Sequence, residues 1–295
     1  DLDESDAITL TDVDTNDGTI TVDAGGALTV TDVASGTNGN IVLSTSSGDI
    51  TGLATVNAGS GNVTLNSAGA IVDDGSSGTV ITGGVLTADA AGAITIDSTV
   101  TSANISTSAA GAVDLDESDA ITLTDVDTND GSITVDAGGL ITATDVVASG
   151  GSGDSVTLST TTGGAVATLV TGADAVSITA NAGDITIGSV TATLGTLGVT
   201  ATAGSINDAA DDNTADFTAG GLITLTAQDE IGVLGSGSDL DLEFAAGSSV
   251  NVSTTGTGAI DLDGLGALTL SDVDTVNGAI TASSAGALTV TDVAS

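Results

Sequence analysis

Acidic motifs with regular oxygen spacing are the residues of this chain that could do chemistry. The sequence Asp-Val-Asp-Thr-Asn-Asp-Gly occupies positions 12–18 and returns at 125–131, with carboxylate or amide oxygens at most positions. Ca²⁺ takes about six to eight oxygen ligands of this kind. The motifs therefore predict weak candidate calcium sites. Their candidate ligands are Asp12, Asp14, Asp17, Asp125, Asp127 and Asp130.

A second acidic pattern, Ser/Thr-Asp-Val, recurs at a constant spacing. It gives the pairs Asp12 and Asp32, Asp125 and Asp145, and Asp272 and Asp292. If this spacing corresponds to one coil, each pair stacks at about 4.8 Å, where like charges repel. Either Ca²⁺ bridges these carboxylates, or turn amides and solvent satisfy them as in ordinary Asp/Asn/Gly turns.

The composition excludes most catalytic chemistry. The 295 residues include 40 Asp plus Glu and no Lys, Arg, His, Cys or Tyr, so only carboxylates, hydroxyls and amides remain. The adjacent acids Asp73-Asp74 and Asp211-Asp212 resemble the paired acids of glycosidases, but neighbours in a strand point to opposite faces. We therefore expect no enzyme activity and assign no catalytic or cofactor-binding residue.

The formal charge of −40 restricts the partners. Nucleic-acid binding is not expected, because phosphate affinity comes from Lys and Arg. Membrane insertion is not expected either, since no apolar run approaches the roughly 18 residues of a membrane helix. No cofactor is required by the residues present. The partners that the charge does favour are divalent cations, Ca²⁺ above all.

Short alternating strands must position these acids. Runs such as Ile8-Thr9-Leu10-Thr11 and Ile20-Thr21-Val22 place apolar residues on one face and Thr on the other, between Gly, Asn, Asp and Ser. Apolar positions repeat with the same spacing as the acidic pairs, as in Leu10 and Val30. We expect Ile8, Leu10, Val13, Ile20 and Val22 to point inward, beneath Leu28, Val30, Val33, Ile41 and Leu43.

The sequence also contains longer repeats, each of which spans more than one short period. Residues 1–33 recur at 114–146 with four substitutions, and the related copies extend over 1–35, 114–150 and 261–295. Their offsets differ, which a solenoid tolerates because extra residues leave at a corner. The segments 149–154 and 208–213 are predicted corner loops. The fold class predicted for 1–295 is all-β, one continuous parallel β-helix (β-solenoid) of about 20–23 residues per coil.

The repeats resemble those of a known family. The stretch GSINDAADDNTADFTAGGLITLTAQDEIG from Gly204, and units of the form G-x-I-T-V-x-A-G-G-A-L-T-V, are similar to repeats of large bacterial exoproteins of the filamentous-haemagglutinin type. The resemblance implies a right-handed parallel β-helix in a very long secreted protein. It also implies an extracellular or cell-surface location and a role as a surface fibre or adhesin.

Two functional hypotheses follow from these patterns. The first is a structural, non-catalytic segment of a giant secreted fibre, filament or adhesin stalk. Because 261–295 replays 1–35, we expect self-association through end-to-end continuation of coils. The alternative is a calcium-dependent or ice-binding surface module. For ice binding, the outward row of Thr9 and Thr11 over Thr29 and Thr31 is expected to break at Val42 and Ser44.

Overall fold

A computed structural model describes all residues except 77, 79, 211, 234–238 and 246–247. The described residues form strands and turns, with no helix among them, so none that could cross a membrane. The chain divides into two compact units, Asp1–Gly138 and Gly139–Ser295. The predicted all-β parallel β-helix is confirmed, and each unit is described by itself.

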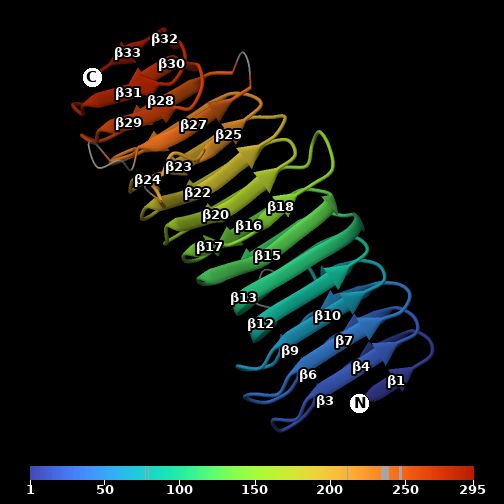
Figure 1. Ribbon diagram of the computed structural model, residues 1–295. Helices are drawn as coiled ribbons and strands as arrows, with labels where there is room; N and C mark the ends of the chain where they lie inside the picture. Colours follow the sequence, from blue (N-terminus) through green and yellow to red (C-terminus); the bar gives the residue numbers. More distant parts are fainter. Residues whose placement is uncertain (77, 79, 211, 234–238, 246–247) are drawn as a thin grey trace. The chain divides into compact units, whose positions relative to one another are not determined.

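The first unit consists of short strands that wind in successive coils (Figure 1). Its strands are β1 (Leu2–Glu4), β2 (Ile8–Leu10), β3 (Val13–Asp14), β4 (Ile20–Ala24), β5 (Leu28–Val30), β6 (Val33–Ala34), β7 (Ile41–Thr45), β8 (Ile50–Leu53), β9 (Val56–Asn57), β10 (Val63–Ser67), β11 (Ile71–Asp73), β12 (Ile81–Ala90), β13 (Ile94–Ala110), β14 (Val113–Glu117), β15 (Ile121–Asp130) and β16 (Ile133–Ala137).

These strands pair in three parallel ladders, one for each side of the coil. One ladder runs through β1, β4, β7, β10 and β12, a second through β2, β5, β8, β11 and β13, and a third through β3, β6, β9 and β12. The long strands β12 and β13 run around a corner and so belong to more than one ladder. Each coil is therefore triangular in its connectivity, with the core enclosed by three sheet faces.

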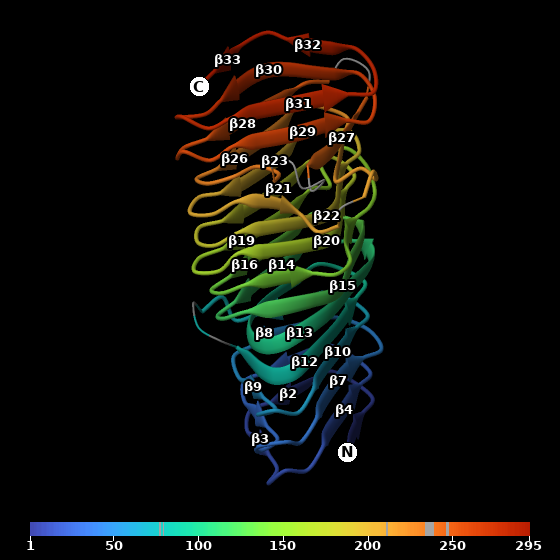
Figure 2. The ribbon, with the colours of Figure 1, turned by 60° about the vertical axis from the view of Figure 1, so that its left-hand side comes forward.

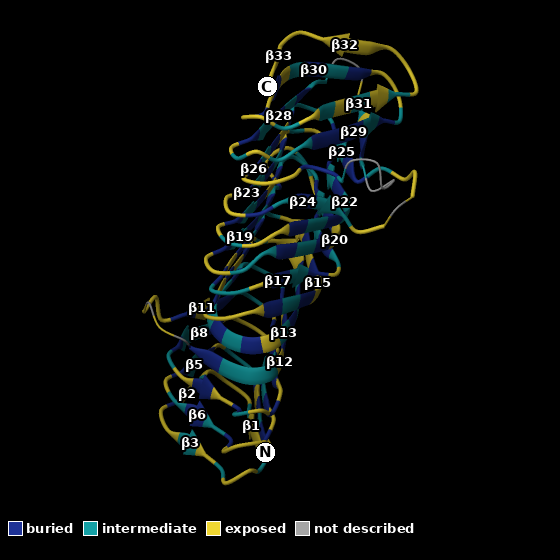
Figure 3. Ribbon diagram, turned by 90° about the vertical axis from the view of Figure 1, so that its left-hand side faces the viewer, coloured by how far each residue is buried: buried dark blue, intermediate teal, exposed yellow. Residues whose placement is uncertain are grey.

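The register confirms the predicted stacking of the first coils. The predicted partners pair one to one: Ile8 with Leu28, Leu10 with Val30, Val13 with Val33, Ile20 with Ile41 and Val22 with Leu43. The upper residue of each pair is fully buried. Burial alternates along the strands, with Thr between the buried positions (Figure 3). The apolar column is the core, and the hydrophobic effect drives its formation.

Hydroxyls form a second internal column, at the corner that follows the first ladder. Thr45, Thr107 and Thr128 are buried, and each donates a hydrogen bond from Oγ1 to the carbonyl of a glycine three or four residues later. Ser67, at the same corner, donates to the Ala70 carbonyl, which also accepts from Ile50 N. Ser35 lies at the corner that follows the third ladder and donates to the Gly39 carbonyl. Each of these hydroxyl bonds closes a turn.

The second unit repeats this architecture, with strands stacked side by side along each face (Figure 2). Its strands are β17 (Ile141–Ala143), β18 (Val146–Ala148), β19 (Val156–Thr160), β20 (Ala165–Gly172), β21 (Val176–Ala180), β22 (Ile185–Ala192), β23 (Leu197–Ala201), β24 (Ile206–Asp208), β25 (Phe217–Ala219), β26 (Ile223–Ala227), β27 (Leu240–Phe244), β28 (Val250–Thr254), β29 (Ile260–Gly264), β30 (Leu268–Asp274), β31 (Ile280–Ser284), β32 (Leu288–Val290) and β33 (Val293–Ala294).

Parallel pairing continues within this unit. One face runs through β19, β21, β23, β26, β28 and β30, and another through β18, β20, β22, β25, β27 and β29. The third copy of the repeat stacks as predicted, with Leu270 beside Val290 and Val273 beside Val293. Phe217 is fully buried in this core, beside Val190 and Leu242.

Coil length varies beyond the predicted range in both directions. The coil from Leu86 to its partner Ala103 is shorter than predicted, because β12 and β13 pass the corner without a loop. The coil from Leu197 to its partner Ile223 is longer. Of the predicted corner loop at 208–213, Asp208 ends β24, residues 209–210 and 212–213 lie outside the strands, and residue 211 lies outside the described residues. The other predicted loop, 149–154, is outside the strands. Loops leave the coil without disturbing the register of the strands that flank them.

The outward threonine row follows a different path from the expected one. Thr9 pairs with Thr29 as predicted, but Thr29 then pairs with Thr51, whereas Val42 pairs with Thr21. The predicted break at Val42 and Ser44 was wrong, because residues 41–45 form the next strand of a different ladder. The row on this face therefore extends over three coils.

Replacing a core residue by an acid tests the ladder. Leu123 is fully buried beside Ala103, so Leu123→Asp buries an unpaired charge and is expected to cost roughly 4 kcal/mol or more of unfolding free energy. Thr124→Asp, at the exposed neighbouring position, adds the same charge and should cost less than about 1 kcal/mol. Urea denaturation of both variants measures the difference. Equal losses would contradict the inward placement of Leu123.

The corner hydroxyls can be tested one at a time. Thr107 Oγ1 donates to the Gly111 carbonyl at 3.0 Å, and the residue is 4% exposed. Thr107→Val keeps the shape and removes the donor, so we expect a loss of about 1–2 kcal/mol. Thr122→Val, on the outward side of β15, should change stability by no more than about 0.5 kcal/mol. A Thr107→Val variant as stable as the wild type would show that the hydroxyl bond is dispensable.

Candidate functional site

The first predicted calcium motif brings some of its acids together. Asp12 and Asp14 lie near Asp32 of the next coil, and the pKa of Asp14 is raised by desolvation and then by the charges of Asp12 and Asp32. All three side chains lie at the surface, fully or in part. The predicted stacking of Asp12 and Asp32 is thus reflected in the electrostatics of Asp14. Whether this group binds Ca²⁺ stays a prediction.

Asp17, the third acid of this motif, is engaged in a turn instead. Its Oδ1 accepts hydrogen bonds from Thr37 N at 2.6 Å and from Thr37 Oγ1 at 2.5 Å, and these bonds lower its pKa. Its backbone is left-handed, with φ of 66°. Gly36 must be glycine, because its φ is 80° and an added Cβ would lie 2.6 Å from Asp17 N. Asp17 therefore joins two successive corners.

The second motif adopts a different local structure despite its identical sequence. Residues 121–130 form the single strand β15, in which Asp125 pairs with Asn104 and Asp127 with Ser106. Asp130 ends the strand beside Ala110. All three acids are exposed. Asp125 and Asp127 project from the same side of β15, because Val126 between them is buried.

The adjacent acids point to opposite sides of the chain, as expected. Asp73 is 9% exposed and accepts a hydrogen bond from Gly75 N at 2.9 Å. Asp74 is exposed and accepts from Ser76 N at 2.9 Å, and the bonds from Ser76 lower its pKa. Of the second pair, Asp211 lies outside the described residues. Asp212 accepts bonds from Thr214 N and Oγ1.

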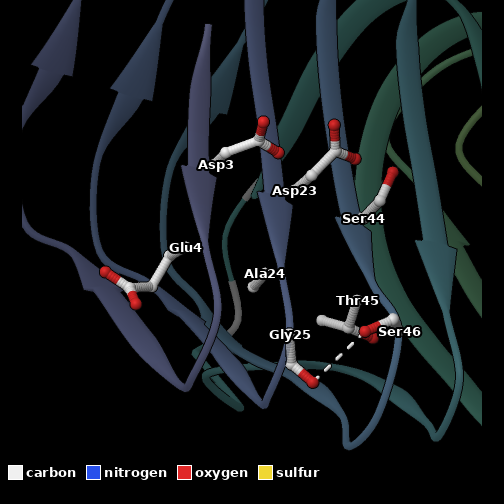
Figure 4. A pocket seen from close by; sticks show the side chains of 8 residues that line it. All are labelled: Asp3, Glu4, Asp23, Ala24, Gly25, Ser44, Thr45 and Ser46. Atoms are coloured by element: carbon white, nitrogen blue, oxygen red, sulfur yellow. Dashed lines mark hydrogen bonds between the residues drawn. The ribbon is translucent and has the colours of Figure 1, made fainter.

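A shallow hollow of about 300 Å³ lies on the first coils (Figure 4). The carboxylates of Asp3 and Asp23 stand side by side there, on paired positions of β1 and β4, with Ser44 next in the row. Glu4 points to the other side of β1. The polar side chains that line the hollow are carboxylates and hydroxyls, and the same groups recur elsewhere on the described surface.

One acid points into the core, which sequence reasoning missed. Glu117 is 4% exposed and lies between Ser98 and Ala137 in the column of inward residues. Its Oε2 accepts bonds from Ser98 Oγ at 2.7 Å and Val100 N at 3.0 Å. Burial nevertheless raises its pKa, because these bonds only partly offset desolvation. The alternation Val113, Leu115, Glu117 is the signal that could have revealed its direction.

An outward acid column on the neighbouring positions was also missed. Asp97, Asp116 and Asp136 pair in register on three successive coils. Desolvation raises the pKa of Asp97 and Asp116, and the charges of neighbouring acids raise both further. The spacing of these acids along the chain, close to one coil at each step, was visible in the sequence. They lie outside the Ser/Thr-Asp-Val pattern, which is why the search for that pattern did not include them.

The second unit also buries carboxylates. Asp216 is 4% exposed, and burial raises its pKa to about 8 despite a bond from Asp241 N at 2.8 Å. Asp241 is 3% exposed, and burial followed by the charges of Asp239 and Asp263 raises its pKa to about 6. These buried acids form a compact group that no sequence motif indicated.

The described side chains that could act chemically are carboxylates, hydroxyls and amides, in stacked rows on the outer face and at the corners. Such groups bind hard cations and accept hydrogen bonds. No protein-family model, no curated protein and no solved structure matches this chain.

Glu117 should make stability depend on pH. Because burial raises its pKa in the folded state above the usual 4.5, its contribution is most favourable below that pH and is lost as pH rises through the folded pKa. Glu117→Gln should therefore be more stable than the wild type near pH 7 and lose less stability between about pH 4 and pH 7. Melting temperatures of both proteins across that pH range measure the difference in stability.

The matched control removes one charge from an exposed strand position. Asp23→Asn, on the outward side of β4, removes one negative charge, as Glu117→Gln does, and leaves the core unchanged. Its melting temperature should change with pH as steeply as that of the wild type. If Glu117→Gln and Asp23→Asn changed the pH profile equally, the effect would come from total charge, not from burial of Glu117.

Proposed function

We propose that this chain is a structural, non-catalytic segment of a large secreted bacterial protein, forming part of an extracellular fibre, filament or adhesin stalk. The resemblance of its repeats to exoproteins of the filamentous-haemagglutinin type supports the proposal. So does the parallel β-solenoid, a fold in which repeats add one after another without a change of design.

One observation carries the proposal: the same sequence phrase makes the same pair of coils in both units. Leu10 pairs with Val30 in the first unit, and Leu270 pairs with Val290 in the second, with the same offset along the chain. The corner residues follow, with Val13 beside Val33 and Val273 beside Val293. A coil pair that keeps the same register in both units is a building block suited to repetition, and self-association would extend the same ladder.

The polar and acidic surface supports a role as a fibre or stalk. Inward positions carry Ile, Leu, Val and Ala, whereas outward positions carry Thr, Ser and Asp, with a formal charge of −40 over the chain. Such a charge keeps neighbouring fibres apart and hydrated at low ionic strength. Parallel backbone ladders join each coil to the next, which gives the continuous connection that a stalk requires.

Immunogold electron microscopy of intact producing cells tests the proposal. Antibodies raised against residues 1–295 should label filaments outside the envelope without permeabilisation, and brief protease shaving should remove the label. An antibody against a cytoplasmic protein of the same cells controls for lysis. Labelling found only after permeabilisation, or label confined to compact particles in the medium, would contradict a surface fibre.

A further inference from the structure

Three acids of the second unit converge at the junction of two coils. Asp241 in β27 pairs with Asp263 in β29, and Asp239 precedes Asp241 by two residues. One carboxylate oxygen from each of these three lies within 4.8 Å of the others. Oxygens around a Ca²⁺ ion at about 2.4 Å are separated by at most about 4.8 Å, so this spacing fits one coordination shell.

The environment of Asp241 is unlike that of an ordinary surface acid. Leu240, Asp241 and Leu242 are all buried in succession, so both faces of β27 are covered at this point. The two leucines face the core, and Asp241 therefore lies on the outward side but out of solvent. Its exposure is 3%. A carboxylate in such a place needs a hydrogen-bond donor or a cation.

Four other buried acids accept hydrogen bonds from backbone amides, and Asp241 differs from them. Glu117, Asp73, Asp154 and Asp216 accept from Val100 N, Gly75 N, Gly151 N and Asp241 N respectively. Among the described residues, no donor contacts the carboxylate of Asp241. Its side chain is directed at two further carboxylates, and the whole sequence contains no Lys, Arg or His to neutralise them.

The surroundings already hold the neighbouring groups in position. Ser283 Oγ donates to Asp263 Oδ1 at 2.6 Å, which fixes one oxygen and leaves the other free to coordinate. Asp216 Oδ2 accepts from the backbone N of Asp241 at 2.8 Å. Asp239 and Asp263 are only partly buried, which gives an ion access from solvent.

We propose that Asp239, Asp241 and Asp263 form a binding site for a hard divalent cation, Ca²⁺ in particular. The three carboxylates supply the charge and at least one oxygen each, and water completes the shell. The site is distinct from the acidic motifs at 12–18 and 125–131. Its physical effect is to join two successive coils across a pair of stacked acids that would otherwise repel each other. It does not depend on where the protein is exported.

Calorimetric titration of residues 1–295 with CaCl₂ tests the site, after removal of metal by chelator and in about 0.15 M NaCl to screen diffuse binding. The wild type should show one saturable site above a weak background. Asp241→Asn and Asp263→Asn should lose that site or bind at least about 10-fold more weakly. MgCl₂ should bind more weakly than CaCl₂, because Mg²⁺ gives up its water reluctantly.

Asp116→Asn is the matched control, since Asp116 also stacks in register between two acids but is exposed. It should keep the saturable site. Circular dichroism confirms that each variant is folded, and hydrogen exchange locates the binding: Ca²⁺ should protect residues 239–242 and 260–264 more than 113–117. Equal titration curves for the wild type, Asp241→Asn and Asp116→Asn, or equal protection of both regions, would overturn the proposal and leave diffuse ion condensation.

Discussion

In-register parallel stacking is the constraint on which everything else in this protein depends. Each residue lies about 4.8 Å from its equivalent in the next coil, so side chains of the same type stack in columns along the solenoid. For apolar residues the repetition is favourable: Ile20 and Ile41 are both buried, and Val63 continues their column. For acids it is not: desolvation raises the pKa of Asp116, and the charges of Asp114 and of its ladder partner Asp136 raise it further. Each column of stacked carboxylates therefore needs its own hydrogen-bond donors, solvent or cations to offset the repulsion.

At the corners, backbone amides of the next coil donate hydrogen bonds to several of these acids. Asp17 accepts a bond from Thr37 N, Asp49 from Ala70 N and Asp184 from Ser205 N, each donor lying one coil further along the chain. Asn40 accepts from Asn62 N in the same manner. Each bond satisfies an amide at a turn, where the ladder is interrupted, and ties one corner to the next. A chain without any cationic side chain can thus use its acids as corner connectors.

The sequence was sufficient to predict the period and the inward column, because both follow from alternation and spacing. Leu10, Val30 and their equivalents could be placed before any coordinates were known. Two features could not. The path of the outward row depended on which of three ladders residues 41–45 join, and the period alone does not distinguish ladders. The grouping of Asp239, Asp241 and Asp263 depends on the burial of both faces of β27, which no local pattern encodes.

Nearly identical repeats acquire different chemistry from the coils beside them. Glu4 and Glu117 occupy the same place in the same phrase, yet within the described part of the chain Glu4 accepts bonds from Ser5 and Asp6 of its own turn alone. Glu117 is buried against Ser98, a residue supplied by β13. Likewise, 8–14 form two short strands while 121–130 form one, since β15 pairs with the long strand β13. In a solenoid, specific sites should therefore arise where unlike coils meet, because there a column can combine groups that no single repeat contains.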